Sequence, residues 1–167
     1  MNENKEIRFI TSDYKELFRI PDGGSIVVTR PEGEEYIHKC KYLGETHFED
    51  SSHCCWHICQ FAERMEQNRA TVKPETEPEI NQGYRIIQRN YANDKIFKLG
   101  VNPKAAQKYV TWQSYRDNPT RYDFGHYWSE RSDANTDLFR RTDAERMGRV
   151  YDYTKFIQQQ KKRDETR

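Results

Sequence analysis

The sequence predicts an α+β protein built from two small modules, each a short antiparallel sheet covered by a helix. Three observations predict this fold class. Runs of β-branched and aromatic residues are separated by Gly, Pro and Asn turns, two segments have helical periodicity, and an acidic, proline-containing stretch divides the chain. We expect an N-terminal module over 1–72, a linker over 73–82, a C-terminal module over 83–160 and a frayed tail over 161–167.

The N-terminal module begins with short strands, which we expect over 7–10, 17–20, 25–29 and 36–43. Ser25-Ile26-Val27-Val28-Thr29 is the clearest of them, because β-branched residues favour the pleated backbone. The turn signals Pro21-Asp22-Gly23-Gly24 and Pro31-Glu32-Gly33-Glu34 flank this strand on either side. A sheet of hairpins is therefore predicted.

The pattern then changes to a helical period. Ile58, Phe61, Ala62 and Met65 recur at i, i+3, i+4 and i+7, which is the apolar stripe of an amphipathic helix. We expect Ser51 or Ser52 to cap its start and its apolar face to cover the preceding sheet. The polar segment 73–79 that follows, with two prolines, is the predicted linker.

The C-terminal module repeats this plan. Strands are expected over 84–89, 96–99, 109–115 and 122–128, separated by turns at Asn93-Asp94, Asn102-Pro103 and Asn118-Pro119. A helix is expected from about Ser129 or Ser132, with Ala134, Leu138 and Phe139 facing inward. A last short helix is expected to bury Tyr153, Phe156 and Ile157.

The composition is that of a heavily solvated chain. Of 167 residues, 34% are hydrophobic and 33% charged, and the mean hydropathy is −1.17. No stretch approaches the roughly 20 apolar residues that span a bilayer, and the first six residues lack the apolar core of a signal peptide. We therefore expect a cytoplasmic protein without a membrane partner, whose four cysteines are reduced.

Charge is unevenly distributed along the chain. Residues 1–80 carry 10 Lys and Arg against 16 Asp and Glu, whereas residues 81–167 carry 18 against 11. An acidic module and a basic module would present different faces, the second suited to a polyanion or an acidic protein. Incidental surface composition is the alternative explanation.

Cysteine and histidine are concentrated between residues 40 and 59. Thiolate and imidazole are the usual ligands of zinc, so we consider a zinc site formed by Cys40, His47, His57 and Cys59. The spacing lacks a C-x-x-C pair, and buried cysteine in a core is the alternative. A Cys59–His nucleophile pair is also available, but Cys59 lies on the apolar side of the predicted helix, which favours core packing.

Arginine and aromatic residues alternate in the C-terminal module. Such a pattern suits base stacking and phosphate contact, and it equally suits a sheet whose rings alternate between core and surface. We expect Trp112 and Tyr127 in the core. A basic stripe follows on the second helix, where intrahelical ion pairs are the alternative. The predicted partner-binding residues are Arg116, Arg121, Tyr122, Arg131, Arg140, Arg141, Arg146 and Arg149.

No pattern of residues predicts catalysis. Gly23-Gly24 lacks the Lys-Ser/Thr and the helix of a phosphate-binding loop, and the carboxylates Asp22, Asp123 and Asp133 lack the spacing of a metal nuclease. We therefore expect a binding protein without a cofactor. A zinc-stapled or hydrolytic enzyme, including a nuclease assembled from distant strands, stays open.

Several short motifs resemble a known group of proteins. The N-terminal ones are Arg8-Phe9-Ile10, Ile20-Pro21-Asp22-Gly23-Gly24, Thr29-Arg30-Pro31, Cys40-Lys41-Tyr42 and His57-Ile58-Cys59-Gln60-Phe61-Ala62-Glu63. The C-terminal ones are Tyr109-Val110-Thr111-Trp112-Gln113, Gly125-His126-Tyr127 and Ser129-Glu130-Arg131-Ser132-Asp133-Ala134. Together they resemble small accessory proteins of Firmicutes conjugative and phage-like mobile elements. In some relatives the N-terminal module precedes a YodL-like domain.

This resemblance implies an accessory protein of a mobile genetic element, and it supplies no catalytic mechanism. Such elements encode many anti-defence proteins, including anti-CRISPR inhibitors. By that analogy we expect an inhibitor that binds a CRISPR effector nuclease or its ribonucleoprotein. The alternative is a regulator of element transfer that binds DNA or RNA through the basic second module.

Overall fold

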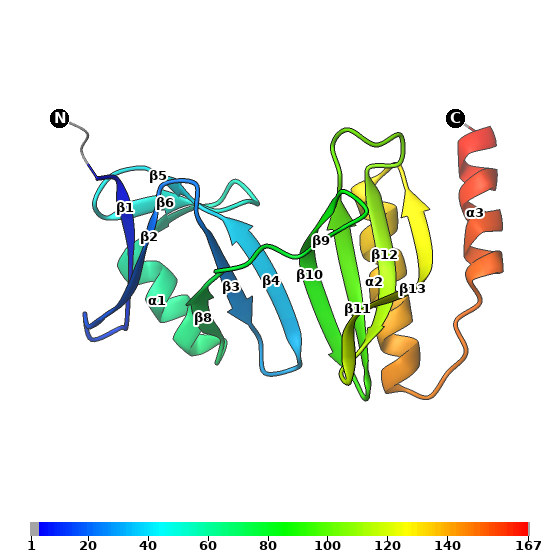
Figure 1. The fold of residues 1–167 in the computed structure, drawn as a ribbon, viewed down its shortest axis with the longest axis horizontal. Helices are drawn as coiled ribbons and strands as arrows, with labels where there is room; N and C mark the ends of the chain where they lie inside the picture. Colours follow the sequence, from blue (N-terminus) through cyan, green and yellow to red (C-terminus); the bar gives the residue numbers. More distant parts are fainter. Residues whose placement is uncertain (1–3, 167) are drawn as a thin grey trace.

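The computed structural model describes residues 4–166, and its N-terminal half is rich in short strands (Figure 1). Eight strands and one helix lie before residue 80: β1 (Glu6–Ile10), β2 (Glu16–Pro21), β3 (Ser25–Thr29), β4 (Glu34–Lys39), β5 (Lys41–Tyr42), β6 (His47–Glu49), β7 (Cys55–His57), α1 (Ile58–Gln67) and β8 (Thr71–Pro74). β1 and β2 form a two-stranded sheet, and β5, β6 and β7 form a three-stranded one.

The C-terminal half has longer strands and two helices. Its elements are β9 (Ile80–Asn81), β10 (Tyr84–Ala92), β11 (Lys95–Val101), β12 (Tyr109–Tyr115), β13 (Asn118–Trp128), α2 (Arg131–Arg146) and α3 (Tyr153–Glu165). β10 to β13 pair in chain order as an antiparallel meander, and β9 pairs with the start of β10. β1 and α3 lie at opposite ends of an elongated molecule (Figure 1).

One sheet runs through both halves, in the strand order β13-β12-β11-β10-β4-β3-β8. The strands of the two halves meet where β4 pairs with β10, and we call this pairing the seam. It comprises three residue pairs: Tyr36 with Gln88, Glu35 with Arg89, and Glu34 with Asn90. The mixed α+β class is confirmed. The seam joins the strands of the two halves into one sheet, which local sequence patterns do not reveal.

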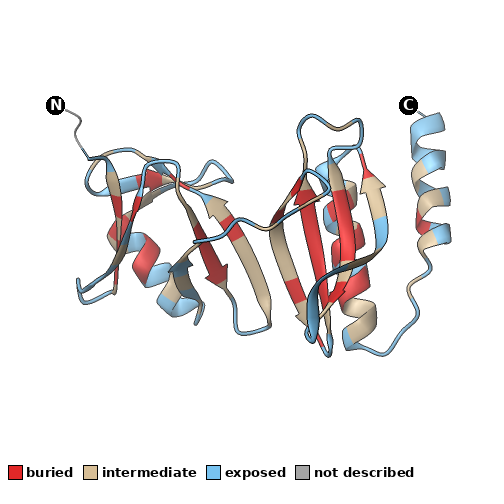
Figure 2. Cartoon of the chain, in the orientation of Figure 1, coloured by how far each residue is buried: buried red, intermediate tan, exposed pale blue. Residues whose placement is uncertain are grey.

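Buried hydrophobic residues form three clusters, one in the N-terminal half and two on opposite faces of the sheet in the C-terminal half. Figure 2 shows buried segments on the strands and helices of both halves. Under α1, the rings of Phe9, Phe48 and Phe61 pack with centroids 5.1–5.7 Å apart. Under α2, a second cluster includes Leu99, Leu138 and Trp128. The third lies on the other face of the sheet, beneath β13, and contains Tyr84, Ile86, Val110 and Trp112, with Tyr127 packed against it.

Most predicted strands are present, and Ser25–Thr29 forms β3 with the bounds expected. The N-cap prediction for the first helix was wrong. α1 begins at Ile58, and the His57 side chain accepts a hydrogen bond from the backbone N–H of Cys59. Residues 55–57 pair with β6 instead, so tertiary contacts place Ser51 and Ser52 before β7.

Two details of the C-terminal half also differ from the prediction. The turn between β12 and β13 lies at Arg116-Asp117, because Asn118 and Pro119 already belong to β13. Phe139 was expected to face inward with Leu138, yet its side chain is 67% exposed. Leu138 lies over the sheet, whereas Phe139 faces the hollow beside α2.

The segments predicted as linker and tail include residues of β8, β9 and α3. The segment 73–82 begins in β8 and ends just past β9, and its carboxylates Glu75 and Glu79 are hydrogen-bonded to β10. At the C-terminus, α3 continues to Glu165. Within residues 4–166, no helix is both long enough and apolar enough to cross a membrane.

Candidate partner-binding groove between α1 and α2

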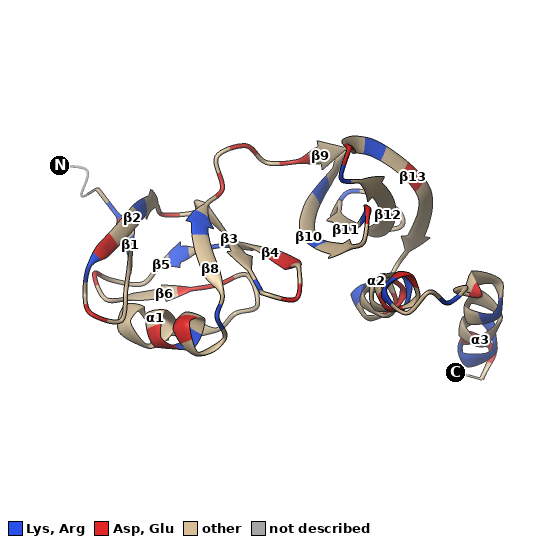
Figure 3. Ribbon diagram, turned by 90° about the horizontal axis from the view of Figure 1, so that it is seen from below, with Lys and Arg blue, Asp and Glu red and all other residues tan. Residues whose placement is uncertain are grey.

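α1 and α2 cover the same face of the main sheet and leave β4 uncovered between them (Figure 3). Strand register explains which side chains line the gap. Tyr36 and His38 pair with Val28 and Ile26, whose side chains lie in the core under α1. Because paired residues share a face of a sheet, Tyr36 and His38 form the floor between the two helices.

Two adjoining hollows of about 410 and 290 Å³ share Tyr36, His38 and Ser52. The larger extends toward α1, where Arg30 and Arg64 line it. The smaller extends toward α2, where Arg131 and Phe139 line it. We call the two together the interhelical groove, defined by Arg30, Tyr36, His38, Arg64, Arg131 and Phe139.

Contacts within the floor fix the orientation of its aromatic side chains. The Tyr36 hydroxyl donates to Glu34 Oε2 at 2.6 Å, and the Arg30 guanidinium lies 5.0 Å from the centre of the Tyr36 ring. The Tyr36 and His38 rings are inclined by 19° with centroids 6.5 Å apart. Burial and the Glu34 contact raise the pKa of Tyr36 to about 12, so its hydroxyl stays protonated at neutral pH.

His38 is a neutral part of the floor. Its Nδ1 lies 2.7 Å from Ser51 Oγ. Burial lowers the pKa of His38, and the positive charges of Arg131 and Arg30 lower it further against the opposing effect of Asp50. The imidazole is therefore uncharged at neutral pH and does not add to the charge of the groove.

The groove has unpaired positive charge. Within residues 4–166, the guanidiniums of Arg30, Arg64 and Arg131 form no ion pair. The carboxylates that line the groove are already engaged: Glu34 accepts from Tyr36, and Asp50 accepts from the Trp56 indole and from backbone N–H groups. The guanidiniums thus remain available to an anionic partner.

The predicted partner-binding residues do not gather at one place. Six of the seven arginines are exposed: Arg116, Arg121, Arg131, Arg140, Arg146 and Arg149. Arg131 lines the groove. The others are spread over the β12–β13 turn, β13, α2 and the segment after it. Arg121 is paired with Asp123 at 2.9 Å, and the Arg140 guanidinium lies 4.5 Å from the centre of the Phe156 ring of α3.

Arg146 connects α2 to the N-terminal half. Its Nη2 donates to the backbone carbonyls of Glu32 (2.9 Å) and Tyr91 (3.2 Å), so α2 is fastened to the β3–β4 turn and to β10.

The prediction that Arg141 faces a partner was wrong, because its side chain is 6% exposed. Its Nη1 donates to the Thr111 carbonyl and hydroxyl and to the Phe124 carbonyl. Nearby, the fully buried Asp137 accepts from the Thr111 hydroxyl, from the Tyr151 hydroxyl at 2.8 Å and from His126 Nδ1 at 2.9 Å. This cluster joins α2 and the segment before α3 to the sheet.

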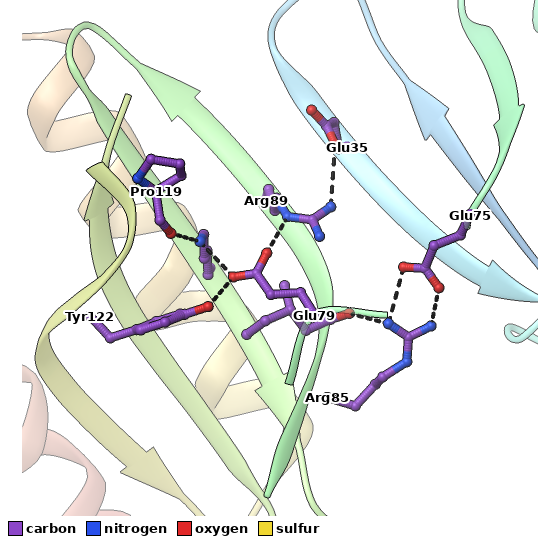
Figure 4. A network of polar contacts seen from close by, with 9 residues as sticks. Glu35, Glu75, Glu79, Arg85, Arg89, Pro119 and Tyr122 are labelled. Carbon is purple, nitrogen blue, oxygen red and sulfur yellow. Dashed lines mark hydrogen bonds and ion pairs between the residues drawn. The ribbon is translucent and has the colours of Figure 1, made fainter. Parts of the chain in front are cut away.

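Tyr122 belongs to a network of polar contacts on the face of the sheet opposite α1 and α2 (Figure 4). The carboxylate of Glu79 accepts from the Tyr122 hydroxyl, from Arg89 Nε at 2.9 Å and from Lys98 Nζ at 2.6 Å. Lys98 Nζ also donates to the Pro119 carbonyl at 2.5 Å. Tyr122 is therefore half-buried and held by Glu79 rather than presented to solvent.

The same network spans the seam. Arg89 also contacts Glu35 of β4 at 3.3 Å, and Arg85 Nη1 donates to Glu75 Oε2 at 3.0 Å. Burial lowers the pKa of Lys98, and the Glu79 carboxylate counters part of this effect. Burial alone would raise the pKa of Glu79, but hydrogen bonds from Lys98 and Tyr122 lower it overall. The network therefore compensates these buried charges, and loss of one partner would leave another uncompensated.

The predicted zinc ligands are not arranged around one point. Among the described residues 4–166, no group of three or more His, Cys, Asp and Glu side chains is placed to hold a metal ion. Cys40 is fully buried, and burial raises its thiol pKa to about 12. His47 and His57 pair across β6 and β7 with ring centroids 4.9 Å apart, and Cys59 is half-buried on α1.

Sequence reasoning missed most of the groove. The strand that forms its floor could be predicted, because the aliphatic Ile37 between the aromatic Tyr36 and His38 is typical of a half-exposed strand. Arg30, Arg64 and Phe139 carry no such signal, because they are brought together by the order of the strands and the placement of the helices. Comparisons of this chain with protein-family models, with curated proteins and with solved structures found no match.

Proposed function

We propose that this chain is an accessory protein of a mobile genetic element that inhibits a CRISPR RNA-guided nuclease by binding it directly. In this proposal the acidic module over 1–72 and the basic module over 83–160 contact different parts of one ribonucleoprotein. The resemblance of the sequence motifs to mobile-element accessory proteins supports the setting, and the split of charge along the chain supports a partner with both protein and nucleic-acid surfaces.

The interhelical groove is the observation that carries the proposal. It combines the guanidiniums of Arg30, Arg64 and Arg131 with aromatic rings on one concave surface. Aromatic residues and arginine are enriched where proteins bind their partners. An RNA-guided nuclease exposes guide RNA and charged channels, which offer anionic groups to such a surface.

A cleavage assay tests the proposal. The chain is added to an RNA-guided nuclease assembled with its guide, target cleavage is measured, and co-purification is followed by size-exclusion chromatography. We expect the wild-type chain to inhibit cleavage and to elute with the complex. Replacing Arg30, Arg64 and Arg131 together by Ala is expected to abolish both effects.

A matched variant separates the groove from charge in general. Replacing Lys41, Lys104 and Lys161 by Ala removes the same number of positive charges from exposed positions outside the groove and outside the predicted partner-binding residues. This control is expected to inhibit like the wild type. Wild-type protein that neither inhibits nor co-purifies with any assembled RNA-guided nuclease would contradict the proposal.

A second candidate function is a nucleic-acid-binding regulator of element transfer. The exposed arginines of the C-terminal half favour it, since Arg131 and Arg149 have no ion pair within residues 4–166. This function predicts affinity for bare DNA or RNA that falls steeply as salt rises, because bound phosphates release counterions. Binding to bare nucleic acid without inhibition of any nuclease would support it over the first proposal.

A further inference from the structure

We propose that the interhelical groove is a binding site for a single unpaired strand of nucleic acid. The inference deepens the function proposed above and rests on it in one respect, namely that the partner carries nucleic acid. It concerns a different set of residues from the arginine-rich strands of the C-terminal half, and three features of the groove carry it.

The first feature is charge on both walls. Arg64 lies on α1 and Arg131 on α2, while Arg30 follows β3 at the foot of the groove. None of the three has a carboxylate partner within residues 4–166. Guanidiniums on opposite sides of a groove suit a ligand whose negative charges repeat along its length, as phosphates do.

The second feature is exposed aromatic surface. The Phe139 side chain is 67% exposed on the α2 wall, although it lines a hollow beside the Tyr36 and His38 rings. An apolar ring left open to water in a cationic groove is suited to stacking with a nucleobase. An acidic peptide would neutralise the arginines but would have no need of the ring, so the combination favours nucleic acid.

The third feature is shape. Duplex DNA is read by an element that protrudes into its major groove. Here the rings of Tyr36 and His38 lie recessed between two helices, on the floor of hollows of about 410 and 290 Å³. A recessed floor is accessible to unstacked bases of an unpaired strand, whereas paired bases present only their edges.

Fluorescence anisotropy with a labelled 12-nucleotide RNA, the matching DNA and the corresponding duplexes tests this inference. We expect the full chain to bind the single strands more tightly than the duplexes. Phe139→Ala is expected to weaken binding roughly 5- to 150-fold, the range found for loss of one stacked base. Arg131→Ala is expected to reduce the slope of log affinity against log salt by about 0.7, the value for one phosphate contact on a single strand.

Two controls match these variants. Phe124 is also 67% exposed but lies on β13, outside the groove, so Phe124→Ala is expected to leave affinity within about twofold. Lys104→Ala removes an exposed positive charge that does not line the groove. Thermal unfolding of each variant confirms that the fold is intact.

Three results would overturn the assignment: absence of strand binding, preference for duplex, or equal losses in the control variants. Binding of poly-glutamate at the same affinity, with Phe139→Ala unaffected, would also overturn it. The same preparations are assayed for nuclease inhibition. Inhibition without strand binding removes this inference and leaves the proposed function, whereas strand binding without inhibition removes the proposed function and leaves this inference.

Discussion

The buried ion network offers a sharp test of how the two halves are joined. The ammonium of Lys98 is 1% exposed and lies between Glu79 Oε2 and the Pro119 carbonyl, with the Tyr122 ring 4.7 Å away. Removing one partner of a buried ion pair costs about 3–5 kcal/mol, because the other charge is left uncompensated. We therefore expect Glu79→Leu to lower the free energy of unfolding by about 3–5 kcal/mol, or the melting temperature by about 6–20 °C for a chain of this size.

The reverse substitution is expected to cost less. In Lys98→Met the Glu79 carboxylate keeps its hydrogen bonds from Arg89 and Tyr122 and is 21% exposed, so the loss is about 1–3 kcal/mol. The double variant Glu79→Leu/Lys98→Met leaves no ammonium stranded. Its loss is expected to fall short of the sum of the single losses by about 0.5–3 kcal/mol, as for residues in direct contact.

Urea unfolding followed by far-UV circular dichroism measures these differences. Glu77 is an exposed carboxylate in the same segment, so Glu77→Leu serves as the control and is expected to change stability by less than about 0.5 kcal/mol. The reasoning is refuted if Glu79→Leu unfolds at the same urea concentration as the wild type. It is also refuted if the loss in the double variant equals the sum of the two single losses.

The pH dependence of the same variants follows from the Glu79 carboxyl. Its pKa in the folded protein lies below the ordinary value of 4.5. A carboxyl of this kind stabilises the fold above its unfolded pKa, and the stabilisation is lost as the pH falls through the folded pKa. The difference in free energy of unfolding between the wild type and Glu79→Leu is therefore expected to have its full value at pH 7 and to shrink below about pH 4.5. A difference that grows on acidification would contradict this assignment.

Two further predictions concern the C-terminal half. Asp137→Asn removes the buried carboxylate beside Arg141, and we expect the free energy of unfolding in urea to fall by about 3–5 kcal/mol. Asp133→Asn is the control, because it breaks the more exposed pair with Arg163 and should cost less than about 1 kcal/mol. Similar losses for both variants would contradict the argument from burial. Gly125→Ala would place a Cβ 2.8 Å from Trp112 Nε1. We therefore expect the free energy of unfolding to fall by about 1–3 kcal/mol and the tryptophan fluorescence to shift. Unchanged stability and fluorescence would contradict the close approach of β13 to that indole.

Local patterns in the sequence predicted local structure well. β-Branched residues between two turn signals predicted β3, and the apolar stripe Ile58, Phe61, Ala62 predicted the buried face of α1. Each of these signals lies within about ten neighbouring residues, so no knowledge of distant partners was needed.

Three features that local patterns did not reveal depend on partners far along the chain. Arg141 reads as a surface arginine, yet carbonyl and hydroxyl acceptors from β12 and β13 allow its burial. The acidic segment 73–82 reads as a linker, yet Glu79 accepts from Lys98, 19 residues away. The seam itself pairs β4 with a strand about 50 residues further on, and no local period encodes such a pairing.

The seam and the Arg146 contacts bear on the thermodynamics of any ligand in the groove. Backbone pairing between β4 and β10 joins the floor to both halves, and Arg146 ties the end of α2 to the Glu32 and Tyr91 carbonyls. These contacts tie the α2 wall to the floor in the absence of a ligand. A ligand that bound the groove in this arrangement would not bear the entropy loss of closing a hinge, so its affinity would reflect the contacts themselves.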